Sequence, residues 1–149
     1  MKFMKALVLG AAFTLSSFNA VAEEVLPEVT VYKSPSCGCC TAWVKHMEEN
    51  GFKVTSHNVQ DVTRYKNAAG VPGNARSCHT AFVGDYAVEG HVPAEDVLKL
   101  LEDRPADVKG LAVPGMPMGS PGMDFGPQKD EYKVISFTKD GKTSVYAQH

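Results

Sequence analysis

Three cysteines within four residues, Cys37, Cys39 and Cys40, are the feature that most limits what this chain can fold into. They end a turn of residues 34–40, the cysteine turn, between an expected strand at 29–32 and an expected helix at 41–50. Backbone N–H groups at the start of a helix favour the thiolate over the thiol. Because the thiolate is both the nucleophile and the metal ligand, this arrangement predicts thiol or soft-metal chemistry.

The elements expected after the cysteine turn alternate between strands and helices. A second strand and a second helix precede two short strands, which the Gly84-Asp85 pair joins as a type II′ hairpin, and a third helix follows. This order is that of a thioredoxin or glutaredoxin core, so we expect a three-layer α/β fold. In that fold the loop entering the hairpin faces the first turn, which would place Cys78 beside the other cysteines. The expected segments are 52–59, 61–69, Thr80–Val83, Tyr86–Glu89 and a helix containing 97–101.

The composition changes after Gly110, where glycine, proline and methionine dominate as far as Gln128. The prolines exclude a helix, so we expect a loop. Met116, Met118 and Met123 lie within eight residues of one another. Their thioethers are either soft metal donors or fillers of apolar gaps. Two final strands, at 132–137 and 143–146, flank an Asp-Gly pair that predicts a C-terminal β-hairpin of unassigned role.

Residues 1–22 have the pattern of a secretory signal peptide, which leaves residues 23–149 as one thioredoxin-like domain. Two lysines precede an apolar run, and Ala20-Val21-Ala22 forms a small-residue cleavage site. The alternative, a membrane anchor, needs about 20 apolar residues, and this run is shorter. Removing two lysines and no acidic residue changes the formal charge from −2 to −4, which gives no electrostatic basis for nucleic-acid binding. We expect a periplasmic protein with no membrane span in its mature part.

The four cysteines permit more than one use. An even number in an exported domain suggests structural disulfides, but a bridge between the adjacent Cys39 and Cys40 would close a strained ring. At most one local bridge between Cys37 and Cys40 and one long bridge could form. Cys37 and Cys40 also have the spacing of thiol–disulfide oxidoreductases. In such an enzyme Cys39 could reshuffle the redox pair, and Cys78 could trap it.

Metal binding would use all four thiols, Cys37, Cys39, Cys40 and Cys78. Copper(I) prefers thiolate and thioether ligands, and neighbouring thiolates can bridge several copper ions. A single zinc ion is the alternative, although structural zinc sites generally separate paired ligands by two to four residues. Two histidines are candidate labile ligands because one adjoins Cys78 and the other follows the hairpin. They are His79 and His91.

At these residues the sequence resembles the CopG family of small exported copper-resistance proteins. The resemblance runs from about Val29 to Met123 and so covers most of the mature chain. It rests on four segments: Tyr-Lys-Ser-Pro-Ser-Cys-Gly-Cys-Cys at 32–40, Ser-Cys-His-Thr at 77–80, Val-Glu-Gly-His-Val-Pro-Ala at 88–94 and Gly-Leu-Ala-Val-Pro-Gly-Met-Pro at 110–117.

This resemblance implies a thioredoxin-like fold and a cysteine-bridged multicopper cluster, copper(I) being favoured, held by the four cysteines. It also implies periplasmic copper handling that includes interconversion of copper(I) and copper(II), with copper chaperones or efflux components as candidate partners. We therefore expect a copper-binding protein that acts in copper resistance, and whether it is also a copper oxidoreductase stays open. The rival function is a thiol–disulfide oxidoreductase that uses Cys37 and Cys40.

Overall fold

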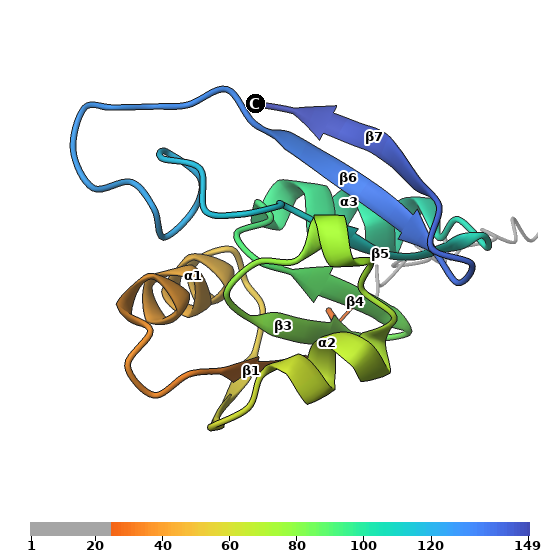
Figure 1. Cartoon of the computed structure of the whole chain (residues 1–149), viewed down its shortest axis with the longest axis horizontal. Coiled ribbons are helices and arrows are strands. Elements are labelled where there is room, and N and C mark those ends of the chain that lie inside the picture. Colours follow the sequence, from red (N-terminus) through yellow and green to blue (C-terminus); the bar gives the residue numbers. More distant parts are fainter. Residues whose placement is uncertain (1–24) are drawn as a thin grey trace, which may run out of the picture.

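The computed structural model describes residues 25–149 as a mixed α/β protein with one seven-stranded sheet, in the order β2-β1-β3-β4-β5-β6-β7 (Figure 1). The predicted signal peptide lies outside these residues. Within the described part, no helix is long and apolar enough to cross a membrane. The elements are β1 (Val29–Lys33), α1 (Gly38–Glu49), β2 (Val54–Asn58), α2 (Thr63–Ala69), the 3-10 turn η1 (Gly73–Ala75), β3 (Thr80–Val83), β4 (Tyr86–Glu89), α3 (Ala94–Asp103), β5 (Val108–Ala112), β6 (Lys133–Thr138) and β7 (Thr143–Gln148).

The sheet mixes parallel and antiparallel pairs. β1 pairs in parallel with β2 and antiparallel with β3, so the first described strand lies inside the sheet. β4 is antiparallel to β3 and parallel to β5, whereas β6 and β7 continue the sheet as an antiparallel hairpin. Because β1 and β3 run in opposite directions, the end of β1 and the start of β3 meet at one edge. Tyr32 is the register partner of Thr80 there.

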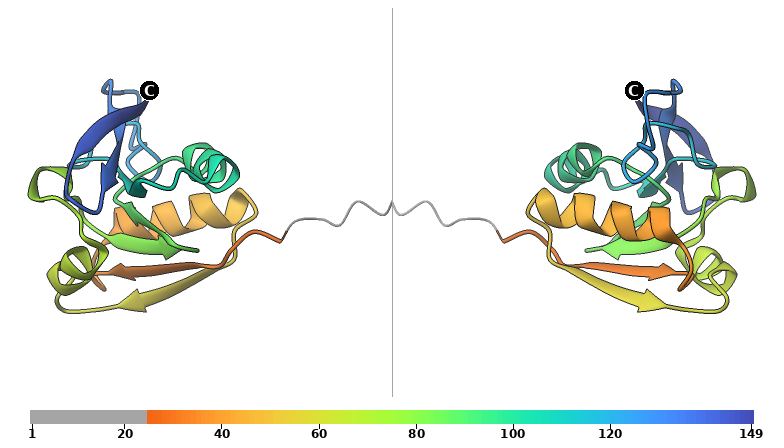
Figure 2. Two further views of the ribbon diagram at one scale, coloured as in Figure 1. Left: turned by 90° about the vertical axis from the view of Figure 1, so that its right-hand side faces the viewer. Right: turned by 90° about the vertical axis from the view of Figure 1, so that its left-hand side faces the viewer.

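Successive side chains of a strand point to opposite faces of the sheet. Both faces carry apolar residues here, and helices cover both. On one face, residues of β1, β3, β4 and β5 pack against α1 and α3, where Trp43, Met47 and Leu100 are fully buried. On the other face, Ala69 of α2 and Ala87 of β4 belong to a smaller apolar cluster. Figure 2 shows α1 and α3 beside each other. The helix that carries Cys39 and Cys40 is therefore held against the larger core.

Two boundaries differ from the sequence predictions. The first helix begins at Gly38 rather than at residue 41, so Cys39 and Cys40 lie in its first turn. The segment 108–112 is a strand, although a loop was predicted from Gly110. A Cβ at Gly110 would collide with the carbonyl oxygen of Ala87 on β4. Glycine therefore permits close pairing with β4 here. The glycine- and proline-rich composition after residue 110 gave no sign of this strand.

The two hairpins form as predicted. β3 and β4 have the expected bounds, and Gly84 has a φ of +55° whereas Asp85 has no positive φ, as a type II′ turn requires. β6 and β7 form the C-terminal hairpin. The long loop between β5 and β6 extends toward α1 (Figure 1). This loop therefore adds a third segment near the cysteine turn.

Candidate metal centre

The start of α1 holds three cysteines in different environments. Cys37 is the N-cap residue, and its sulfur accepts a hydrogen bond from the backbone N–H of Cys40 at 3.3 Å. Such an acceptor satisfies one of the N–H groups that the first helical turn leaves without a backbone partner. Cys40 is fully buried, whereas Cys37 and Cys39 are partly exposed. Their sulfur atoms lie 3.5 Å apart.

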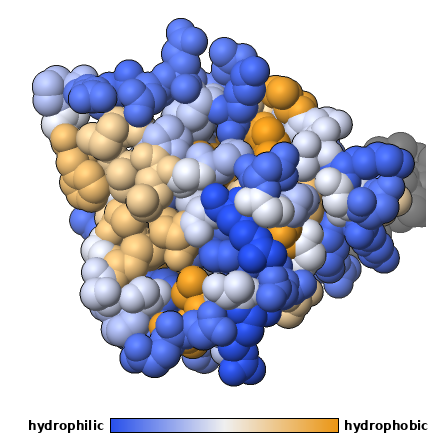
Figure 3. Space-filling view, in the orientation of Figure 1, coloured by the Kyte–Doolittle hydropathy of each residue, from blue (hydrophilic) through white to orange (hydrophobic). Residues whose placement is uncertain are grey.

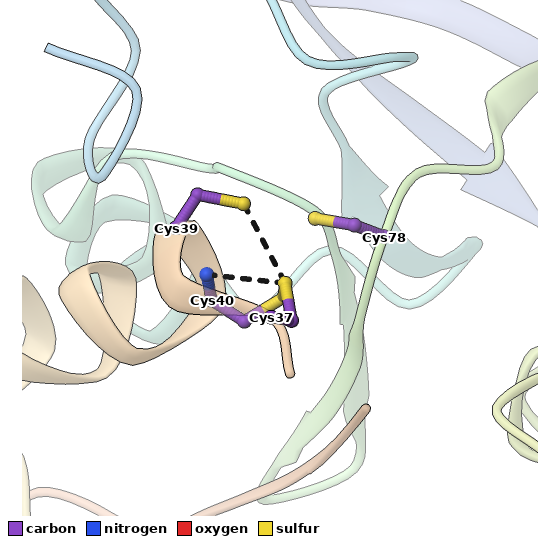
Figure 4. A group of neighbouring side chains, drawn as sticks. All are labelled: Cys37, Cys39, Cys40 and Cys78. Atoms are coloured by element: carbon purple, nitrogen blue, oxygen red, sulfur yellow. Dashed lines mark hydrogen bonds between the residues drawn. A yellow bond between two sulfur atoms is a disulfide. The ribbon is translucent and has the colours of Figure 1, made fainter. Parts of the chain in front are cut away.

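Cys78 lies in the loop that enters β3. The antiparallel pairing of β1 with β3 brings this loop to the end of β1, where the cysteine turn begins. As a result, the sulfur atoms of all four cysteines lie within 4.8 Å of one another (Figure 4). The predicted proximity of Cys78 to the cysteine turn is therefore confirmed.

The four cysteines are not all free thiols. A disulfide joins Cys37 to Cys40, with their Cα atoms 5.3 Å apart, while Cys39 and Cys78 are free. This is the local bridge that the spacing allowed. A disulfide sulfur is not a thiolate, so this form offers two thiols and the reduced form would offer four. The oxidation state of the turn therefore decides how many soft donors converge.

Cys78 contacts two imidazole rings. Its sulfur lies 2.9 Å from Nε2 of His91 and 3.4 Å from Nδ1 of His79. Burial raises the pKa of the Cys78 thiol to about 11; a hydrogen bond from Ser77 opposes this shift, whereas charge on Cys39 adds to it. Without a metal ion, Cys78 is therefore a protonated thiol at neutral pH.

The orientation of the His91 ring is fixed by a backbone group. Its Nδ1 lies 2.8 Å from the carbonyl oxygen of Pro121, and because a carbonyl can only accept, Nδ1 carries the proton. In the neutral ring Nε2 then has the lone pair, and Cys78 donates its S–H to it. Burial lowers the pKa of His91, although the bond to Pro121 acts in the opposite direction. A neutral imidazole with its lone pair directed at a thiol is suited to metal coordination.

His79 is fully buried beside the indole ring of Trp43, with ring centroids 4.5 Å apart. Its Nε2 has no hydrogen-bond partner among the described residues. Burial holds the pKa of His79 well below its usual value; charges on His91 and Lys66 lower it further, and a backbone hydrogen bond with Gly90 opposes them. The donor atoms of Cys78, His79 and His91 lie within 4.8 Å of one another. We call these three residues the sheet group.

A buried ion pair, which the sequence analysis missed, holds the loop before Cys78. Glu89 is fully buried and lies 2.6 Å from Nζ of Lys66. The same carboxylate accepts hydrogen bonds from the hydroxyl of Thr80 at 2.6 Å and from the backbone N–H of Ser77 at 2.7 Å. A carboxylate ending an otherwise apolar strand was the only sequence signal. Glu89 therefore positions the residues on both sides of the Cys78-His79 pair.

The β5–β6 loop packs on the cysteine helix through Gly122. A Cβ there would lie 2.6 Å from the carbonyl oxygen of Cys39 and 2.8 Å from the backbone nitrogen of Trp43. Because Pro121 precedes Gly122, the contact that seats the loop on α1 also holds the carbonyl that orients His91. The loop thus connects the cysteine turn to the sheet group.

The three methionines of this loop differ in exposure. Met116 is 52% exposed, whereas Met118 and Met123 are partly buried. Met123 directly follows Gly122, whose backbone packs on α1, while the backbone N–H of Met118 donates a hydrogen bond to Asp130 at 2.9 Å. A hydrophobic area covers the side of the molecule where this loop and α1 lie (Figure 3). The exposed Met116 contributes apolar surface that the core does not use.

Fold and site together define a mixed α/β protein with cysteines and histidines grouped so that they could hold a metal ion. Residues 75–123 match a family of proteins of unknown function, DUF411. No curated protein matches the chain.

Two solved structures are similar over most of the chain. One, described as copper resistance protein CopG form 2, shares 49% identity with a TM-score of 0.79, covering 85% of this chain and 99% of that one. The other, CopG form 1, shares 49% identity with a TM-score of 0.77 and covers 83% and 98%. The chain therefore belongs to the CopG copper resistance family, as its sequence motifs indicated.

Proposed function

We propose that this protein binds copper in the periplasm and acts in copper resistance, with Cys37, Cys39, Cys40 and Cys78 as its ligands. The convergence of four cysteine sulfurs within 4.8 Å carries the proposal. Thiolate is the ligand type that copper(I) prefers, and the relatives at 49% identity are copper resistance proteins. Copper is here the cargo of the protein.

The bound copper forms a multinuclear copper(I) cluster bridged by thiolates. Cys39 and Cys40 are consecutive, and Cys37 lies 3.5 Å from Cys39, so one sulfur has neighbours on both sides. Such crowding favours bridging over a single tetrahedral ion whose ligands are spaced along the chain. The Cys37–Cys40 disulfide must be reduced before all four sulfurs can bind.

The same disulfide supports interconversion of copper(I) and copper(II). A disulfide and two thiolates differ by two electrons. Oxidation of the Cys37 and Cys40 thiolates to the disulfide releases two electrons, which would reduce two copper(II) ions to copper(I). Disulfide formation and copper reduction are therefore balanced within one site.

The fold is of the thioredoxin type, and the order strand, cysteine turn, helix, strand, helix, hairpin, helix supports this assignment. A strand order of β2-β1-β3-β4, in which β3 runs antiparallel to the other three strands, adds further support. Export through the signal peptide at residues 1–22 would deliver the domain to the periplasm. Copper chaperones or efflux components would then be its partners.

Met116, Met118 and Met123 supply additional thioether donors from the β5–β6 loop. Replacing all three by leucine keeps apolar volume and removes sulfur, so it separates ligation from packing. We expect copper to pass faster to a competing chelator in this variant. Unchanged release with unchanged thermal stability would assign the methionines to packing alone.

Copper stoichiometry on the reduced protein tests the main proposal. The mature protein, reduced and kept anaerobic, is given copper(I), and bound copper and free thiols are measured together. We expect several copper ions per chain with all four thiols protected, and a lower stoichiometry for Cys39→Ser because a hydroxyl is a poor ligand for soft ions. A single bound zinc ion, or no retained copper, would refute the cluster.

A second candidate function is thiol–disulfide exchange, and the Cys37–Cys40 disulfide favours it. An exchange enzyme should tolerate loss of Cys39 and Cys78, whereas a copper cluster should not. We expect slow reduction of insulin by the parent protein. Efficient reduction that Cys39→Ser leaves intact would favour the oxidoreductase.

A further inference from the structure

The sheet group of Cys78, His79 and His91 remains complete when the Cys37–Cys40 disulfide is formed. We propose that the disulfide form of this protein binds one divalent metal ion of intermediate softness, such as zinc(II) or cobalt(II), through these three residues. One thiolate and two imidazoles are a donor set that such ions accept, with a fourth position left for water or another ligand.

The distances fit an ion with little movement. Typical zinc–sulfur and zinc–nitrogen bonds at a tetrahedral angle place sulfur and nitrogen about 3.6 Å apart. Cys78 Sγ already lies 3.4 Å from Nδ1 of His79. Its distance to Nε2 of His91 is 2.9 Å, the length of a hydrogen bond, and would open by less than about 1 Å. The ion would take the place of the proton between sulfur and nitrogen, and that proton would leave to solvent.

The surroundings fix the two rings in different ways: His91 is held as metal ligands usually are, whereas His79 is held by packing and its Nε2 has no hydrogen-bond partner among the described residues. Ligating histidines commonly donate their other N–H to a carbonyl, and His91 donates Nδ1–H to Pro121 at 2.8 Å. The ring of His79 packs on Trp43, whose indole N–H is in turn fixed by the carbonyl of Val92 at 2.9 Å. Both imidazoles are fully buried, while the half-buried Cys78 gives an ion a route of entry.

This site shares Cys78 with the proposed copper site but does not depend on it. Cys39 belongs to the group of four cysteines and not to the sheet group. Loss of Cys39 should therefore separate the two. In the disulfide form Cys78 would bind a divalent ion of intermediate softness, and in the reduced form it would bind copper.

Cobalt(II) is the probe, because a bound thiolate gives a charge-transfer band and tetrahedral geometry gives intense visible bands. It is titrated into the protein with the Cys37–Cys40 disulfide intact, as checked by mass spectrometry. We expect one cobalt ion per chain with both signals, and zinc should displace it. Cys78→Ser should remove the charge-transfer band and weaken binding by more than about 100-fold, and His91→Gln should weaken it by at least about 10-fold.

Cys39→Ser is the discriminating variant, since it should lose copper stoichiometry when reduced yet keep the cobalt spectrum when oxidised. Circular dichroism and thermal melts show whether His91→Gln folds, and Cys78→Ser keeps the test decisive if it does not. No thiolate band in the oxidised parent, or one lost in Cys39→Ser, would overturn the inference. Copper(I) stoichiometry of the reduced parent is measured separately, so failure of this site and failure of the copper proposal are distinct results.

Discussion

The two sides of the candidate metal centre are built in different ways. The cysteine turn places Cys37, Cys39 and Cys40 within four residues, at the start of one helix whose cap is Cys37 itself. In the sheet group, Cys78 and His91 are 13 residues apart, and His91 is oriented by a carbonyl 30 residues further on. Local sequence determines the first side, whereas tertiary packing determines the second.

This difference extends to the chemistry. The cysteine turn can change its donors, because Cys37 and Cys40 form a disulfide. The sheet group has a single sulfur and two buried rings, so its donors stay the same when that disulfide forms. If the proposed metal sites are right, a centre with one variable and one constant side would hold different metal loads in its two redox states.

The sharpest test of the comparison is Cys78→Ser, for which we expect the largest effect. If both sides share copper, the reduced variant should lose copper about as severely as Cys39→Ser, because serine is a poor soft-metal ligand. Copper per chain and free thiols measure this loss. The metal-free variant should stay folded, since Cys78 is only half buried.

A crosslink provides the control for Cys78. Oxidised, metal-free parent protein should yield a peptide that joins Cys78 to the cysteine turn, because thiols this close can form a bridge after a small movement. Full copper occupancy in Cys78→Ser, with no such crosslink in the parent, would show that the cysteine turn works alone.

The same division explains how much could be predicted from the sequence. Alternating apolar residues and an Asp-Gly or Gly-Asp pair identified the strands and hairpins, because those patterns repeat over a few residues. The order of these elements then placed Cys78 correctly. β5 was missed because its glycine is explained only by the neighbouring backbone of Ala87.

The supports of the sheet group could not be predicted for the same reason. Glu89 and Lys66 are 23 residues apart, and no local spacing relates them. The carbonyl of Pro121 carries no side-chain signal, although it orients His91. The positions of the two histidines, beside Cys78 and after the hairpin, identified them as candidate ligands. The packing that orients their rings could not be predicted from those positions.

Glu89→Gln tests whether buried charge holds the sheet group in place. The substitution keeps the shape and leaves Lys66 without its buried carboxylate, so we expect a loss of about 3–5 kcal/mol in the free energy of unfolding. Copper should also leave faster, because Ser77 loses its charged acceptor. Chemical denaturation and chelator competition measure the two effects.

Asp103→Asn is the matched control for Glu89→Gln. Its partner Lys99 is 61% exposed, so solvent screens this ion pair and it should contribute little to the free energy of unfolding. The double variant Lys66→Met/Glu89→Leu should recover much of the stability, since apolar residues can replace a buried pair. If Glu89→Gln were as stable as Asp103→Asn, the ion pair would not position Cys78.

Gly122→Ala tests the loop that connects the two sides. A methyl group there would meet the backbone of Cys39 and Trp43, so the loop must move away from α1 and take the Pro121 carbonyl with it. Gly126→Ala is the control, because both glycines have positive φ but nothing lies within 4 Å of a Cβ at Gly126. We expect Gly122→Ala to be less stable than the control by about 1–3 kcal/mol in thermal or chemical unfolding. If Gly122→Ala and Gly126→Ala had equal stability and released copper equally fast, the contact of the loop with α1 would not support the site.

The smallest expected effect concerns His46, which lies on α1 but serves α3 rather than the cysteines. Its Nε2 accepts the backbone N–H of Ala94 at 3.0 Å, as only the unprotonated nitrogen can. Burial lowers the pKa of His46, although the charges of Glu49, Asp124 and Glu95 oppose this shift. The unfolded chain therefore binds more protons than the folded protein below a pH of about 6.5, and stability should fall as the pH falls through that range.

His46→Gln keeps a hydrogen-bond acceptor and removes the titration. Between about pH 7 and pH 5 its free energy of unfolding should fall less steeply than that of the parent, by no more than about 1.5 kcal/mol, the upper range for one neutral hydrogen bond. His79 and His91 are present in both proteins, so the difference between the two slopes isolates His46. Parallel slopes would mean that the contact between α1 and α3 does not depend on a neutral imidazole. A smaller slope in the variant, with unchanged copper stoichiometry, would show that the cysteine helix is anchored to α3 independently of the metal it presents.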